Sequence, residues 1–214
     1  MSGLKARADL ARTAHAGYLR TLEDKYQHRK AWREQFRIPA LGICGMGRAG
    51  KDTAAEFLCA CTKMIYPGSA SQMILPLLTN MVYDDNRDVL EESRPSIEQK
   101  VFDDRHSHRE FWIAACHALR GNDYGLLVRM CLGAGDIAVG IRGRLELETV
   151  LRDQIITTAM WIDNPRVPHD ITVEYGPEDC DVMIPNYGSV LELYAKLRKW
   201  LYCAQYGAFT TKGV

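Results

Sequence analysis

The residues best suited to chemistry lie in a glycine-rich segment, Gly45-Met46-Gly47-Arg48-Ala49-Gly50-Lys51, which fits the pattern G-x-x-x-x-G-K. An apolar run, "LGIC", precedes this segment, and a helix-forming run, "KDTAAEFLCAC", follows it. Consecutive amides of such a loop can turn towards an anion, and the start of the helix adds the positive end of its dipole. The segment therefore predicts a phosphate-binding loop, and the alternative is a plain glycine-rich turn before a helix.

Within this loop we expect six residues to hold the phosphates of a nucleotide, with Lys51 supplying a mobile positive charge: Gly45, Gly47, Arg48, Ala49, Gly50 and Lys51. Asp52 follows Lys51 where the common pattern has Ser or Thr, and a hydroxyl comes only at Thr53. Asp52 could hold Mg²⁺ through water, or it could cap the helix while Thr53 contacts the phosphates. Thr53 and Asp52 are therefore the candidate metal-organising residues.

Phosphoryl transfer also needs cations around the moving group, because negative charge spreads over its oxygens. Arg142 and Arg144 follow an apolar run and begin a helical pattern, where a phosphate would be expected. They are either phosphate contacts, or solvated residues at a helix start or salt-bridge partners.

Four further side chains are candidates for the acceptor or for a lid. Arg109 and Trp112 suit a nucleotide, since an aromatic ring stacks on a base while a guanidinium binds phosphate, although ordinary core packing explains the aromatic as well. Asp84 could orient the acceptor, or it could belong to a solvated turn. Arg166, in the proline-containing loop "DNPRVP", is either a lid residue over ATP or a surface residue.

The elements that position these residues alternate between strands and helices. Short apolar runs predict buried strands within 39–45, 136–142, 154–163 and 181–186. Amphipathic patterns predict helices at 51–64, 75–85, 109–121, 123–133, 144–153 and 189–204, the last with Ser189 as its N-cap. This alternation indicates an α/β fold with a parallel sheet covered by helices on both faces.

The first 37 residues differ from the rest of the chain. Residues 1–37 hold nine Lys/Arg and four Asp/Glu, a net charge of +5, so the remaining 18 Lys/Arg and 23 Asp/Glu give −5. Apolar residues recur there every four positions, which predicts a helix. We expect a basic helical N-terminal arm (residues 1–37) that packs on the body, joins a homodimer or contacts nucleic acid, attached to a domain over 38–214.

Composition excludes several classes of protein. No run approaches the roughly 18 apolar residues of a membrane span, so we expect no membrane association. Seven cysteines without a CxxC pair favour buried thiols over a disulfide framework or a zinc site, and a cytoplasmic location fits them best.

The combination of "GxxxxGKDT", "DIAVGIRGRLELE" and "DITVEYGPEDCDVMIPNYGSVLELYAKL" resembles the deoxynucleoside monophosphate kinases of bacteriophages and their P-loop relatives. The resemblance covers about residues 38–203. Arg142 and Glu146 match the "R-F-x-N-E" segment of that group. The closing D-x-x-I-x-N-x-G-(S/T) pattern is met by Asp181, Ile184, Asn186, Gly188 and Ser189.

The resemblance implies a three-layer P-loop kinase fold, ATP and Mg²⁺ as cofactors, and a nucleoside monophosphate as the small-molecule acceptor. It places Asn186 on the nucleotide side and Lys51, Arg142 and Arg144 in catalysis. One departure is Gly140, where many relatives carry Asp, so Asp52, Asp84 or Asp85 would have to substitute near the metal. Two other functions remain open: a kinase acting on a nucleotide within DNA, and a nucleotide-binding protein without transferase activity.

Overall fold

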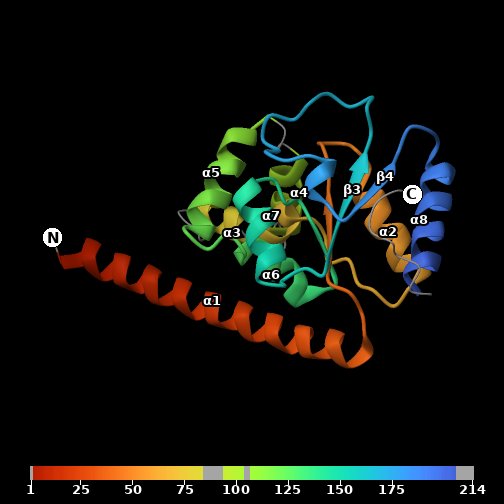
Figure 1. The fold of residues 1–214 in the computed structure, drawn as a ribbon. Helices are drawn as coiled ribbons and strands as arrows, with labels where there is room; N and C mark the ends of the chain where they lie inside the picture. The colour runs from red at the N-terminus through yellow and green to blue at the C-terminus, as the bar shows by residue number, and fades with distance from the viewer. Residues whose placement is uncertain (1, 84–93, 104–106, 206–214) are drawn as a thin grey trace.

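The computed structural model describes residues 2–83, 94–103 and 107–205 (Figure 1). At its centre is a sheet of four parallel strands in the order β2-β1-β3-β4. The strands are β1 (Leu41–Cys44), β2 (Ile137–Val139), β3 (Thr158–Asp163) and β4 (Val182–Pro185). In the register, Gly42 lies between Ala138 of β2 and Ala159 of β3. The segment that follows β1 therefore begins in the middle of the sheet's carboxyl edge, where ligands bind in open α/β sheets.

Helices cover both faces of this sheet (Figure 1), and the side-chain alternation of β1 explains why. Leu41 and Ile43 point into a core shared with Leu58 on one side, while Cys44 joins Leu132 on the other, and all five are fully buried. Strands buried on both faces must be apolar throughout, as β1 and β2 are. The covering helices are α2 (Lys51–Cys61) and α8 (Val190–Gln205) on one face, and α6 (Leu126–Ala134) and α7 (Arg144–Arg152) on the other.

Helix α8 illustrates how the sequence sets an element. The Ser189 hydroxyl accepts a hydrogen bond from the Glu192 amide at 3.3 Å, which confirms the expected N-cap. Leu193, Leu197 and Trp200 recur at helical spacing and are buried against the sheet.

A group of helices lies beside the sheet, built around a core of Ile74, Trp112, Leu126, Leu127 and Met130. Its members besides α6 are α3 (Ala70–Tyr83), α4 (Arg94–Asp103) and α5 (Arg109–Arg120). The sequence indicated no element between residues 86 and 108, so α4 is an addition. Its few apolar side chains, among them Val101 and Phe102, pack against this core and give no regular stripe by themselves.

The N-terminal arm is a single helix, α1 (Ser2–Phe36), whose second half packs on α6 (Figure 1). Arg29 donates hydrogen bonds of 3.1 and 2.6 Å to the two carboxylate oxygens of Asp136. Arg33 donates to the carbonyls of Leu132 and Gly135 at 2.7 and 2.8 Å. Asp136 is fully buried, so two charges of the basic arm are used inside the protein.

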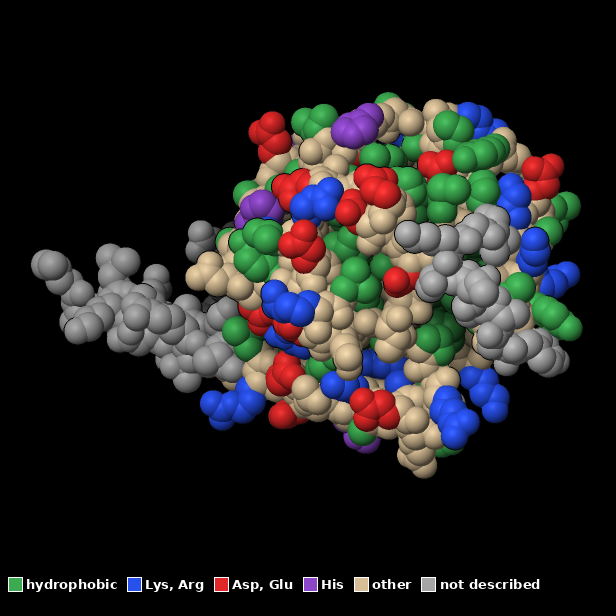
Figure 2. All heavy atoms as spheres, viewed as in Figure 1, with side chains coloured by type: hydrophobic (Ala, Val, Ile, Leu, Met, Phe, Trp, Pro, Cys, Tyr) green, Lys and Arg blue, Asp and Glu red, His purple; other side chains and the backbone are tan. Residues whose placement is uncertain are grey.

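The structure confirms an α/β fold with a parallel sheet and helices on both faces, compatible with three layers. Within the described residues, no helix combines the length and the apolar character needed to cross a membrane. On the face drawn in Figure 2, the coloured Lys, Arg, Asp and Glu side chains are interspersed and do not form a broad region of one sign.

Candidate functional site

The glycine loop joins β1 to α2 and has the backbone conformation that its glycines predict. Gly45 has φ 133° and Gly50 has φ 98°, values that side-chain-bearing residues rarely adopt. A Cβ on Gly45 would lie 2.6 Å from the carbonyl oxygen of Ile162, so the loop passes directly against the end of β3. Arg48 also has a positive φ, 62°. Three of the seven motif positions thus turn the chain back on itself.

Lys51 begins α2, and its side chain turns into the loop. Its ammonium group donates to the carbonyls of Gly45 at 2.8 Å and Met46 at 2.5 Å. The residue is only 8% exposed. Burial is the main cause that lowers the pKa of Lys51 to about 8, and the positive charge of Arg142 is the second. A cation held in this way is ready to exchange carbonyl partners for phosphate oxygens.

The loop's amides are the other expected phosphate donors. The Ala49 amide donates to the Met46 carbonyl at 3.2 Å. The amides of Gly47, Arg48 and Gly50 make no hydrogen bond to another residue in the described part of the chain. These donors sit at the amino end of α2, where the helix dipole also favours an anion.

Asn186 supports the loop from the end of β4. Its side-chain amide donates to the Ala49 carbonyl at 2.8 Å, and a Cβ on Gly50 would lie 2.7 Å from the same nitrogen. Arg166 donates to the carbonyls of Asn186 and Gly188 at 3.3 and 3.0 Å. The structure thus brings Asn186 to the glycine loop and Arg166 to the turn that carries Asn186.

The two candidate metal residues differ in their surroundings. Asp52 is exposed and accepts a hydrogen bond from the hydroxyl of Tyr66. Thr53 lies in the first turn of α2, and its hydroxyl has no hydrogen-bond partner among the described residues. The same part of the chain holds no group of three or more His, Cys, Asp or Glu arranged to bind a metal.

The absence of an acidic residue at position 140 has a backbone cause. Gly140 has φ 112°, and a Cβ there would lie 3.2 Å from the Cβ of Ala70. A carboxylate-bearing residue at this position would be strained. Asp136 is at the opposite end of β2, bound to Arg29. Asp163, the last residue of β3, places a carboxylate at the carboxyl edge of the sheet, and the Tyr187 hydroxyl donates to it at 2.5 Å.

A cluster of two arginines and one carboxylate lies beside the loop. Arg109, at the start of α5, donates to both oxygens of Asp170 at 2.5 Å. Arg142, after β2, donates to Asp170 at 2.7 Å and to the Thr172 hydroxyl at 2.8 Å. A Cβ on Gly47 would lie 3.1 Å from an oxygen of Asp170. The structure therefore brings Arg109 and Arg142 together next to the phosphate loop.

The turn that carries Arg142 is held by Glu146, which is 4% exposed. The Glu146 carboxylate accepts a hydrogen bond from the Arg142 amide at 3.0 Å. Burial raises the pKa of Glu146, while the backbone hydrogen bonds from Arg142 and Gly143 oppose this shift. Glu146 thus sets the direction of the turn and leaves the Arg142 side chain free to reach Asp170.

Other expected site residues lie elsewhere. Arg144 is exposed and binds Asp179 at 2.9 and 3.1 Å, so it points away from the Arg109–Arg142 pair. Trp112 is 6% exposed and packs edge-on to Phe102 in the helical core, which favours the packing interpretation over base stacking. Asp84 lies outside the described residues, as does Asp85.

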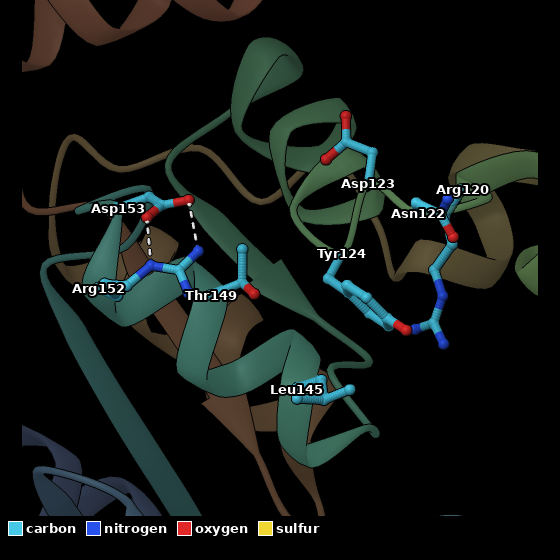
Figure 3. Close-up of a pocket in the computed structure, with 8 residues that line it drawn as sticks. All are labelled: Arg120, Asn122, Asp123, Tyr124, Leu145, Thr149, Arg152 and Asp153. Carbon is cyan, nitrogen blue, oxygen red and sulfur yellow. Dashed lines mark hydrogen bonds and ion pairs between the residues drawn. The ribbon is translucent and has the colours of Figure 1, made fainter.

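A separate groove of about 780 Å³ lies between the turn before α6 and the outer side of α7 (Figure 3). Its walls carry Arg120, whose guanidinium lies 4.7 Å from the ring centre of Tyr124, and Leu145 and Thr149 on α7. None of the glycine-loop residues lines it. We place the candidate site at the glycine loop, where the lysine and the arginine pair meet, and not in this groove.

Sequence reasoning missed Asp170 and Thr172, which hold the two arginines. The resemblance drew attention to the segment that begins with Asp170, but no local pattern distinguishes this carboxylate from its neighbours. No known protein-family model matches the chain, and no curated protein matches it.

Proposed function

We propose that the protein transfers the γ-phosphoryl group of ATP to a nucleoside 5′-monophosphate and so forms ADP and a nucleoside diphosphate. One observation carries this proposal: a glycine loop that buries a lysine lies beside two arginines from distant segments, and both arginines bind one carboxylate, that of Asp170. The arrangement suits two phosphate groups that must come together, one held by the loop and one by the arginines.

In the proposed reaction, an oxygen of the acceptor phosphate forms a bond to the γ-phosphorus while the bond to the bridging oxygen of ADP breaks. The loop amides and Lys51 hold the β- and γ-phosphates of ATP, and Arg109 and Arg142 hold the acceptor phosphate. The acceptor phosphate is already anionic at neutral pH, so no general base is needed. Arg144 has no part in this proposal because Asp179 holds it elsewhere.

Mg²⁺ fits this site through its oxygen donors. Mg²⁺ binds phosphates and water with only one or two protein ligands, so the lack of a carboxylate cluster among the described residues does not conflict with it. Thr53 would contribute its hydroxyl, and Asp52 or Asp163 would hold metal-bound water. The ion would neutralise charge that develops on the transferred group.

An acceptor within DNA has less support. Of the basic side chains in the N-terminal arm, Arg29 and Arg33 are 17% and 4% exposed and are turned towards Asp136. They are therefore not available for phosphate contacts with a polyanion, on which salt-dependent DNA binding would depend.

The test is ADP formation from ATP and Mg²⁺ with a panel of acceptors: the four deoxynucleoside monophosphates, their ribonucleotide counterparts and duplex DNA. Lys51→Met is the test variant, and Lys63→Met, at an exposed position just after α2, is its matched control. We expect turnover with at least one free monophosphate and a loss of about 10²- to 10³-fold in kcat for Lys51→Met, typical for removal of one preorganised donor.

Three other results would contradict the proposal. Turnover only with duplex DNA would transfer the activity to a polymer-borne acceptor. ATP binding without turnover on any acceptor would indicate a nucleotide-binding protein without transferase activity. Equal turnover by Lys51→Met and Lys63→Met would mean that the glycine loop takes no part in the reaction.

A further inference from the structure

The Asp170 carboxylate, beside the glycine loop, accepts five hydrogen bonds from the described residues. Both its oxygens accept from Arg109 at 2.5 Å, and one also accepts from Arg142 at 2.7 Å. The other accepts from the Thr172 hydroxyl at 2.6 Å and from the Thr172 amide at 3.1 Å. The Asp170 side chain is 7% exposed, whereas those of Arg109 and Arg142 are 43% and 38% exposed. The buried Asp170 carboxylate thus binds two arginine side chains that are otherwise partly exposed to solvent.

The charges in this cluster do not balance. Two guanidinium groups, each with a permanent charge of +1, share one carboxylate of charge −1. Burial raises the pKa of Asp170, but hydrogen bonds from Thr172, Arg109 and Arg142 outweigh it and hold the pKa well below its usual range. Asp170 is therefore ionised at neutral pH, and in direct contact the two arginines share only one negative charge. A phosphate dianion would match the pair better than the carboxylate does.

The position of Asp170 is the one a second phosphate would need. Its amide donates to the sulfur of Met46 at 3.4 Å, and its carboxylate would lie 3.1 Å from a Cβ on Gly47. The carboxylate therefore lies directly beside the loop that would hold the γ-phosphate. An acceptor phosphate bound by Arg109 and Arg142 would occupy the same space as the Asp170 carboxylate.

We propose that Asp170 is a built-in competitor of the acceptor: its carboxylate occupies the acceptor-phosphate position and must be displaced before transfer. This inference rests on the function proposed above. When the Asp170 carboxylate is displaced, the N–H groups of Arg109 and Arg142 donate to the incoming phosphate instead. A neutral nucleoside offers no charge to replace the carboxylate, so Asp170 restricts the acceptor to compounds with a phosphate dianion.

The chain around Asp170 allows a local movement of this kind. The Glu174 amide donates to the Arg142 carbonyl at 3.0 Å, and the Tyr175 hydroxyl donates to the Ile141 carbonyl at 2.8 Å. These bonds anchor the segment just after Asp170 to the turn after β2. Release of the carboxylate therefore breaks the bonds to Thr172 and the arginines without undocking the whole segment.

The first test is titration of inorganic phosphate into the wild-type protein, Asp170→Asn and the matched control Asp179→Asn. Asp179 is a carboxylate of the same segment, bound to Arg144 and not to the arginine pair. Because hydrogen bonds to a charged group are stronger than those to an amide, we expect Asp170→Asn to bind phosphate about tenfold more tightly and Asp179→Asn to match the wild type. Equal or weaker binding by Asp170→Asn would overturn the proposal, since Asp170 would then merely order the arginines.

The place of binding is tested by adding Arg109→Met to Asp170→Asn. Loss of the gain in the double variant puts the phosphate on the arginines. A gain that persists puts it in the glycine loop and overturns the proposal.

Hydrogen exchange of the wild-type protein gives an independent test that needs no variant to fold. Saturating phosphate should accelerate exchange of the Thr172 amide, which loses its bond to Asp170, relative to chloride at equal ionic strength. Unchanged or slower exchange would count against displacement.

Failure of this inference can be told apart from failure of the proposed function. The phosphate titration uses neither ATP nor a nucleotide. Suppose that Asp170→Asn binds phosphate more tightly but no acceptor in the panel is phosphorylated. That result would support the displacement of Asp170 and contradict the proposed phosphotransferase activity. Suppose instead that the wild type phosphorylates an acceptor and that Asp170→Asn binds phosphate with the same affinity as the wild type. That result would support the phosphotransferase activity and contradict the role of Asp170 as a competitor.

Discussion

Replacement of Asp136 by Ala should separate α1 from the body of the protein. Asp136 is fully buried and accepts hydrogen bonds from Arg29 at 3.1 and 2.6 Å and from the Ile65 amide at 2.9 Å. Its carboxylate also lies 3.8 Å from the guanidinium of Arg33, whose side chain is 4% exposed. The Asp136→Ala variant leaves these donors without an acceptor and leaves the charge of Arg33 buried.

Removal of one partner of a buried ion pair costs about 3 to 5 kcal/mol, because the remaining charge stays desolvated. That is a large part of the about 5 to 15 kcal/mol by which a domain is stable. With a urea m-value of about 2 to 3 kcal/mol/M, the unfolding midpoint should fall by about 1 to 2.5 M.

The assay is urea unfolding followed by far-ultraviolet circular dichroism, with Asp153→Asn as control. Asp153 pairs with the neighbouring Arg152 on the surface, at 2.7 Å, and its loss should leave the midpoint unchanged. Equal midpoints for Asp136→Ala and Asp153→Asn would refute the view that Asp136 fastens α1. A separate early transition in Asp136→Ala would mean that α1 detaches before the sheet unfolds.

Three further predictions concern the glycine loop and the backbone. ATP affinity should fall as the pH rises through about 8, because Lys51 has its pKa lowered to about 8 and must be protonated to bind phosphate, and calorimetric titration of Lys51→Met should lose this dependence. Gly140→Ala should lower the free energy of unfolding by about 1 to 2 kcal/mol, because φ is 112° there. Gly17→Ala, in the interior of α1 with no atom within 4 Å of the new Cβ, should raise it by about 0.5 to 1 kcal/mol in the same urea assay.

Much of the fold could be predicted because its elements carry local signals. The strands are short continuous apolar runs, and α8 has both a Ser189 cap and an apolar stripe. Helix α4 escaped prediction because its charged sequence has no stripe, and it packs through a few side chains such as Phe102. Local pattern is thus enough where an element buries a whole face, and it fails where neighbours decide the packing.

The same distinction between local and long-range signals decides which residues of the candidate site could be predicted. Lys51 could be found because the loop's spacing is local, and the glycine conformations at 45 and 50 agree with it. Asp170 could not, because its partners Arg109 and Arg142 are 61 and 28 residues away in the chain. Arg142 and Arg144 looked equivalent in the sequence. They diverge because Asp170 binds one and Asp179 binds the other.

The attachment of α1 has a consequence for the order of events during synthesis. Arg29 and its acceptor Asp136 are 107 residues apart, and α1 leaves the ribosome before Asp136 does. At about 5 to 20 residues per second, about 5 to 20 s pass before Asp136 follows Arg29. Until α6 follows, the partly buried side chains of Tyr18, Leu19 and Leu22 lack their partners Leu126, Leu127 and Met130. A nascent chain that ends before Leu126 presents α1 without α6, the helix on which it packs, so α1 is secured long after it is made.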